Sequence, residues 1–168
     1  MPTKSPQLWL VKSEPDEFSW QDLVDSKGKR THWDGIRNYQ VRNFMRDDMK
    51  KGDLLLYYHS NAKPPGVVGI AEIVKEAYPD HTQFDPKSKK FDAKSKPESP
   101  TWLMFDLKAK RKLKKFVPLQ DLKDNDKLAD MLVVQRGQRL SIQPVEQKDW
   151  DEVLKMAGCS AADWRRGW

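Results

Sequence analysis

Apolar residues along the chain fall into short runs that are separated by turn-forming residues. These runs are rich in apolar, β-branched and aromatic side chains and are too short for buried helices, so they indicate strands. The strand that begins at Trp102 is expected to continue into a lysine-rich stretch. We predict strands at 8–12, 54–58, 67–74, 102–107 with a continuation toward 115, 116–119 and 139–145.

Elsewhere apolar side chains recur at helical spacing, and capping residues mark where those helices begin and end. Ser19 has the position of an N-cap, while Gly52 and Gly158 have the positions of C-terminal stops. Because strands and helices do not alternate regularly, the order of elements argues against a parallel sheet. An α+β domain built on a small, strongly curved sheet or barrel of five or six strands, with peripheral helices, fits best. We predict helices at 20–26, 38–51, 124–134 and 150–157.

One long segment, 81–100, contains no predicted helix or strand. It holds a short repeat, because the sequence Phe-Asp-Pro-Lys-Ser-Lys of 84–89 returns nearly unchanged at 91–96. Loops of this length are uncommon inside compact domains and are often functional. No linker divides the chain. We predict a single domain over 1–168, with its core at about 7–157 and a C-terminal tail at 159–168.

Positive charge is concentrated in one part of the chain. The formal net charge is +6, yet the segment 86–115 alone has eleven Lys or Arg residues against three acids. Such a basic segment fits a surface that meets a polyanion. A solvated lysine-rich loop would have the same composition, so both interpretations stay open.

Other features exclude whole classes of protein. A single cysteine, Cys159, excludes an internal disulfide, and His32, His59 and His81 show no metal-ligand spacing. There is no apolar run of about 18 residues and no charged-then-apolar leader. We therefore expect no metal, no cofactor and no membrane partner, and a soluble cytoplasmic protein, or a nuclear one if the source is eukaryotic.

Three compact blocks, at 9–15, 33–43 and 52–60, combine aromatic rings with small polar groups and charges. A flat ring beside hydrogen-bonding groups and cations is what a protein needs to hold a nucleobase. In the first block, Glu14 is able to accept a hydrogen bond from an exocyclic amine. Alternatively, Ser13 or Glu14 simply caps the following turn.

The other two blocks have equally ordinary alternatives. Trp33, which we expect in a loop, either stacks on a base or folds over the core, and Gly35 permits an unusual backbone conformation beside it. Arg37 and Asn38 at a helix start suit a phosphate, although capping by Asn38 is as common. His59 either contacts a base edge or makes a plain hydrogen bond at its strand end.

Arg139, Ser141 and Gln143 share one face of the last predicted strand, which is either a solvent face or a polar pocket wall. Catalytic signatures are missing from the sequence. There is no Gly-x-Ser-x-Gly elbow, phosphate loop, dinucleotide fingerprint or zinc-deaminase motif. We therefore expect a binding protein and not an enzyme.

Taken together, the blocks resemble the EVE domain family. This resemblance covers about 7–157 and implies a PUA-like fold related to the YTH and ASCH domains. EVE domains are regarded as readers of modified bases in DNA or RNA, so the resemblance implies a nucleic-acid-binding module. The matching motifs are Trp9-x-x-Lys-Ser-Glu-Pro15, Trp33-Asp-Gly-Ile-Arg-Asn-Tyr39, Tyr58-His-Ser60, Pro100-Thr-Trp102 and Arg139-Leu-Ser-Ile-Gln-Pro-Val145.

The resemblance also implies a role for individual residues. A flipped, modified base, with methylation as the favoured modification, would stack on Trp33 in a pocket. An enzyme acting on a nucleic acid or nucleotide, and a module for a small molecule or protein partner, stay open as alternatives. The pocket would be lined by Ser13, Glu14, Trp33, Asn38, His59, Ser60, Arg139 and Ser141, with Trp20 and Trp102 as further candidate rings. Phosphates would be met by Arg37, Arg42, Arg139, Lys87, Lys89 and Lys90.

Overall fold

The computed structural model describes residues 6–159 of the chain. They form a mixed sheet of six strands, in which β1 and β3 pair in parallel and all other pairs are antiparallel. The α+β prediction is confirmed. The predicted tail at 159–168 lies outside the described residues except for Cys159. In spatial order the strands are β2 (Arg30–Trp33), β5 (Leu103–Pro118), β4 (Gly66–Pro79), β3 (Leu54–His59), β1 (Leu8–Ser13) and β6 (Ile142–Pro144).

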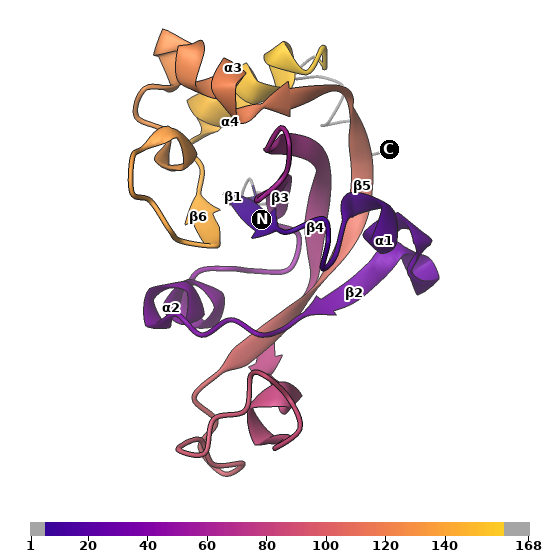
Figure 1. The fold of residues 1–168 in the computed structure, drawn as a ribbon, viewed down its shortest axis with the longest axis vertical. Helices are drawn as coiled ribbons and strands as arrows, with labels where there is room; N and C mark the ends of the chain where they lie inside the picture. The colour runs from indigo at the N-terminus through magenta and orange to yellow at the C-terminus, as the bar shows by residue number, and fades with distance from the viewer. Residues whose placement is uncertain (1–5, 160–168) are drawn as a thin grey trace, which may run out of the picture.

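The two longest strands give the sheet its curvature. β4 and β5 span 14 and 16 residues, and the register between them shifts at several points along their length. Such irregularities bend a strand and increase its twist. In Figure 1, β5 sweeps in one arc from the end of the molecule that carries α3 and α4 to the loop that follows β4. The sheet is therefore strongly curved, and β2 and β6 lie at its two edges.

Both faces of the sheet are buried, which explains the continuous apolar runs in the central strands. Along β1, Leu8 and Leu10 point into one core cluster, while Trp9 and Val11 point into the other. The first cluster is covered by α3 (Leu119–Asp124) and α4 (Gln147–Met156), and the second by α1 (Trp20–Asp25) and α2 (Tyr39–Asp47). No helix in residues 6–159 is long and apolar enough to cross a membrane.

The predicted helix at 124–134 is wrong. The chain instead forms α3, which ends at Asp124, and then two 3-10 turns, η3 (Asp126–Leu128) and η4 (Leu132–Val134). The side chain of Asn125 accepts a hydrogen bond from the Lys127 backbone, so it starts a new turn where the pattern suggested continuity. Leu128, Met131 and Val133 are buried all the same, which is why the apolar spacing resembled that of a helix.

Several other elements differ from the predictions, among them β4, which continues to Pro79, and α4, which begins at Gln147. α2 ends at Asp47, because Asp53 accepts the Lys50 backbone N–H and turns the chain before Gly52. β6 is limited to Ile142–Pro144, so residues 139–141 precede the strand. The short strand β2 was missed, since its alternation of exposed and half-buried positions lacks an apolar run.

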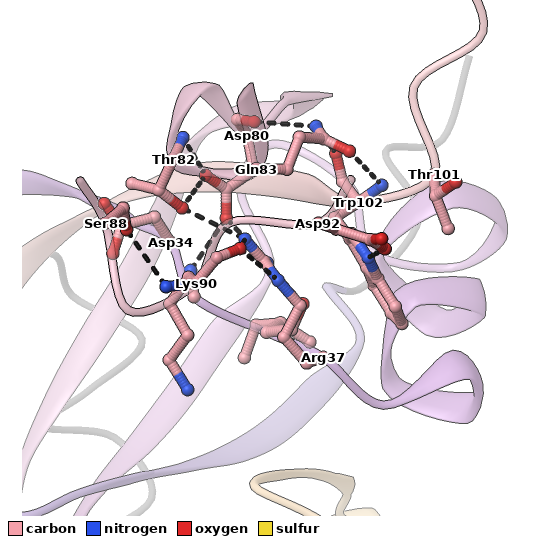
Figure 2. A network of polar contacts seen from close by, with 12 residues as sticks. Asp34, Arg37, Asp80, Thr82, Gln83, Ser88, Lys90, Asp92, Thr101 and Trp102 are labelled. Carbon is pink, nitrogen blue, oxygen red and sulfur yellow. Dashed lines mark hydrogen bonds and ion pairs between the residues drawn. The ribbon is translucent and has the colours of Figure 1, made fainter. Parts of the chain in front are cut away.

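The basic loop at 81–100 is ordered by a buried amide. It begins with η2 (His81–Phe84), in which the side chain of Gln83 donates to the carbonyls of Asp80 and Trp102, at 2.6 and 2.7 Å. The same side chain accepts from Ser95 and from the Trp102 backbone, so Gln83 joins both ends of the loop (Figure 2). The loop therefore has a fixed path even though it contains almost no regular structure.

The sequence repeat in this loop produces the same turn twice. The side chain of Asp85 accepts the Lys87 backbone N–H at 2.9 Å, and the side chain of Asp92 accepts the Lys94 N–H at 3.0 Å. These are Asx-turns, in which a short acidic side chain replaces a backbone acceptor. The repeat is thus structural in origin.

Candidate functional site

A pocket opens where the parallel strands β1 and β3 end side by side. The Ser60 backbone N–H donates to the Ser13 carbonyl at 3.0 Å, and the Lys12 N–H donates to the Ser141 carbonyl at 2.8 Å. These two bonds bring three distant segments together at one end of β1 and β3. The pocket has a volume of about 740 Å³ and is lined by Lys12, Ser13, Glu14, Glu17, Phe18, Thr31, His32, Trp33, Asp34, Gly35, Ile36, Arg37, Ser60, Lys90, Arg139 and Ser141.

At the end of β1, two side chains offer hydrogen-bond acceptors to the pocket. The Ser13 hydroxyl donates its hydrogen to the Phe18 carbonyl, which also accepts from the Tyr57 hydroxyl at 3.1 Å. Ser13 therefore keeps only acceptor capacity for a ligand. Glu14 is a carboxylate acceptor, and it is held in place by the Asn61 amide at 2.6 Å. Burial raises the pKa of Tyr57 to about 12, so that hydroxyl stays a donor to the backbone.

Cationic donors lie on the same walls. Lys12 is half-buried, its ammonium is 3.5 Å from the Gln138 carbonyl, and burial lowers the pKa of this lysine. Arg139 and Lys90 are exposed at the rim. Sequence reasoning missed Lys12, although it directly precedes Ser13 in the first block. Its signal was a charged residue inside an otherwise apolar strand.

Aromatic rings form the apolar side of the pocket. Trp33 lies in β2 and not in a loop, and its half-buried ring meets Phe18 and Tyr57 edge to face at centroid distances of 6.0 and 5.8 Å. Such contacts fix the orientation of the indole. Trp33 and Phe18 line the pocket, whereas Tyr57 lies behind them.

A buried acid holds the far wall of the pocket together. Asp80 accepts hydrogen bonds from the Gly35 backbone at 2.8 Å, from Arg37 at 3.1 Å, and from both the backbone and the hydroxyl of Thr82 (Figure 2). Burial alone would raise the pKa of the Asp80 carboxyl, but the bonds from Thr82, Gly35 and Arg37 hold it below its usual value. Asp80 is therefore a charged, fully buried anchor.

The network explains the two unusual residues of the second block. Gly35 has a φ of +79°, as the sequence suggested, and its backbone passes Lys90 so closely that a Cβ would lie 3.3 Å from that side chain. Arg37, predicted to bind phosphate, lines the pocket but also bonds to Asp80, Thr82 and the Lys90 carbonyl. Its guanidinium is thus already engaged in linking the second block to the basic loop.

Several predicted base-pocket residues lie outside the lining and have other contacts. Asn38 caps α2 by accepting the Val41 N–H. Nε2 of His59 accepts the Trp20 backbone N–H at 3.1 Å, and burial lowers the pKa of this histidine. The ring of Trp20 is buried in the core, and Trp102 is buried at the base of the loop.

Of the residues predicted to contact phosphates, some line the pocket and others lie outside it. Arg42 donates to the Thr101 carbonyl at 3.1 Å and to the Asn43 side chain, which ties α2 to the end of the loop. Lys87 and Lys89 are exposed on the loop, outside the pocket lining. Lys90 lines the pocket, and Figure 2 shows its ammonium pointing away from the Asp80 network. The structure thus brings together Ser13, Glu14, Trp33, Ser60, Arg37, Lys90, Arg139 and Ser141.

The fold and the order of these segments identify the class of protein. The chain matches the EVE domain over residues 7–156 and belongs to that family. Among its relatives is human thymocyte nuclear protein 1, which is 44% identical in an alignment 165 residues long that covers 88% of this chain and 72% of the human protein. The chicken protein of the same name is 46% identical, over 88% of this chain and 67% of its own length.

Solved structures agree with this assignment. The human protein in complex with DNA containing 5-methylcytosine superposes with a TM-score of 0.85 at 43% identity, covering 90% of this chain and 97% of that one. A protein from Pseudomonas syringae gives 0.83 at 44% identity, with coverages of 89% and 99%. An ASCH protein from Zymomonas mobilis gives 0.52 at 9% identity over 89% and 98%, which shows a shared fold alone.

Proposed function

We propose that the chain is a DNA-binding module that takes one modified nucleobase, with methylated cytosine as the favoured base, into the pocket at the ends of β1 and β3. The observation that carries the proposal is a pocket that combines acceptors, donors and an aromatic ring. The human relative, which was crystallised with DNA containing 5-methylcytosine, supports the choice of base. The proposal is for a binding module without catalytic activity. Its cellular location stays a prediction.

The hydrogen-bonding groups favour a base that has an amino group. Ser13 and Glu14 offer acceptors, which suit the exocyclic amine of cytosine or adenine. Lys12 and Arg139 offer donors, which suit a carbonyl or ring nitrogen of the same base. Thymine and uracil have a carbonyl where cytosine has its amine, so they would face Glu14 with two acceptors opposed.

Stacking and phosphate contacts supply the affinity in this proposal. Extrusion of a base costs a few kcal/mol, and stacking on an aromatic ring such as Trp33 returns about 1–3 kcal/mol. Phosphate contacts from Lys90 and Arg139 at the rim then provide a salt-dependent share. Net affinity is therefore expected to fall steeply as salt rises.

The methyl group itself gives limited discrimination. Burial of one methyl contributes about 0.8 kcal/mol, which corresponds to a preference of about fourfold over unmodified cytosine. A larger preference would require that unmodified cytosine leaves a polar group unpaired. The binding assay must therefore resolve differences of severalfold.

The test is a competition assay with matched oligonucleotides that differ at one base: cytosine, 5-methylcytosine, 5-hydroxymethylcytosine, adenine or N6-methyladenine, as DNA and as RNA. We expect the 5-methylcytosine DNA to bind most tightly, and Trp33→Ala and Glu14→Gln to reduce that preference. Glu98→Gln, which changes an exposed acid of the loop outside the pocket, is the matched control. Equal affinity for all bases would refute the proposal, and turnover of any oligonucleotide would refute its non-catalytic part.

A further inference from the structure

We propose that His32, Asp34 and His81 form a binding site for a divalent transition metal ion of the zinc class. His32 lies in β2, Asp34 follows that strand, and His81 begins η2. Each side chain offers one ligand atom, and these atoms all lie within 4.8 Å of one another. The sequence predicted no metal, because β2 and η2 are far apart in the chain and produce no short spacing motif.

The distances match metal coordination. Nε2 of His32 lies 3.2 Å from Oδ2 of Asp34. Zinc bonds of about 2.0–2.2 Å to nitrogen and oxygen place neighbouring ligand atoms about 3.3 Å apart in a tetrahedron. One edge of that tetrahedron is thus already formed. The rings of His32 and His81 have centroids 5.4 Å apart, and the ligand atom of the exposed His81 lies within 4.8 Å of the other two. The proposal requires that His81 moves closer to complete the other two edges.

The chemistry of the three ligand side chains determines which metal ions they suit. Two imidazoles and one carboxylate suit zinc, cobalt, nickel or copper, whereas magnesium and calcium prefer all-oxygen sites. Three protein ligands leave a tetrahedral ion with one open position. His32 and Asp34 also line the pocket, so water or an oxygen atom of a pocket ligand is able to occupy that position.

The scaffold holds the ligand-bearing segments together before an ion arrives. Asp80 and Thr82 flank His81, and both bond to the segment that follows Asp34: Asp80 accepts from Gly35, and both residues bond to Arg37 (Figure 2). Because Asp80 is fully buried, these bonds are shielded from water. Such support from neighbouring residues is what orients metal ligands in proteins.

A plain ion pair between His32 and Asp34 is the ordinary alternative, and it makes a different prediction. That pair has no need of His81 and gives no saturable metal binding. The inference is also independent of the proposed function, because the test below contains no nucleic acid.

The test is isothermal titration of the tag-free full chain with ZnCl₂ and, separately, with MgCl₂ in a non-chelating buffer. We expect one saturable Zn²⁺ site and no Mg²⁺ site. His81→Ala and His32→Ala are each expected to weaken Zn²⁺ binding by at least about tenfold, the scale of loss seen even for outer metal partners. His59→Gln is the matched control, since His59 is the third histidine of the chain and lies outside the cluster.

Melting curves in EDTA show whether each variant is folded, and the exposure of His32 and His81 predicts little change there. Absence of saturable Zn²⁺ binding at millimolar concentration would overturn the proposal. Retention of wild-type Zn²⁺ affinity by His81→Ala would overturn it equally. A loss of Zn²⁺ affinity in His59→Gln as large as that in His81→Ala would also overturn it.

Discussion

Substitution of Asp80 by alanine tests whether the buried network holds the site. The carboxylate is fully buried and accepts four hydrogen bonds, two of them from Gly35 and Arg37 and two from Thr82. Removal of one partner of a buried ion pair costs about 3–5 kcal/mol. Four hydrogen bonds, each with a net contribution to stability of about 1 kcal/mol, give a similar figure. For a domain of this size, that loss corresponds to a melting temperature lower by about 6–20 °C.

The assay is urea and thermal unfolding of the wild type, Asp80→Ala and the control Glu98→Ala, which removes an exposed acid of the same loop. The control is expected to change the free energy of unfolding by no more than about 0.5 kcal/mol. Because the folded-state pKa of Asp80 is lowered, the stabilisation from its charged form is complete above the unfolded value. The difference between wild type and Asp80→Ala is therefore expected to shrink as pH falls below about 4.

A loss of less than about 1 kcal/mol in Asp80→Ala would refute the reasoning. It would mean that water satisfies the four donors after the carboxylate is removed, and that the pocket wall needs no charged anchor. If the loss of unfolding free energy in Asp80→Ala stayed constant down to the lowest pH, the assignment of Asp80 as ionised would be refuted.

Three further predictions follow from single contacts. His59→Gln should remove part of the acid sensitivity of folding: burial lowers the pKa of His59, so wild-type stability is full above about pH 6.5 and falls as pH drops through that folded-state pKa. Urea unfolding at a series of pH values measures this, and an unchanged pH dependence would contradict it. Gly69→Ala should cost about 1–3 kcal/mol, because a Cβ would lie 2.6 Å from the buried Trp20 ring; a wild-type melting temperature would show that the ring moves freely. Lys90→Gln should lower the slope of log affinity for DNA against log salt by about 1, whereas Lys148→Gln on α4 should leave it unchanged; equal slopes in all three proteins would exclude Lys90 from phosphate binding.

Much of the fold was predictable because local sequence and tertiary structure agree. The run at 54–58 is apolar on both faces since β3 lies between two core clusters. Ser19 caps α1 as expected, through a capping box with Asp22. The prediction of a helix at 124–134 failed because burial alone, without a continuous helix, produced the same apolar spacing. The strand β2 was not predicted because it is a short edge strand whose sequence has no apolar run.

The site was predictable only in part, for a related reason. Motif resemblance drew attention to Ser13, Glu14 and Trp33, which the structure places on the pocket lining. It could not show that Asn38 is used as a helix cap, or that Trp102 is buried beneath the loop. Those roles depend on how distant segments pack. Phe18 was missed because a single residue beside a motif carries no signal until the strand ends are placed together. Lys12 was missed although its charge inside an otherwise apolar strand was a signal.

The hydrogen bonds around Gln83 change what the lysine-rich loop is able to do. A disordered basic segment loses chain entropy when it settles on a phosphate backbone. In this chain the Gln83 amide and the two Asx-turns have already fixed the backbone that carries Lys87, Lys89 and Lys90. The positive charges of the loop are therefore presented at set positions in the free protein. A DNA strand would meet a preshaped basic arm beside the pocket, and most of the entropic cost of ordering that arm has been met during folding.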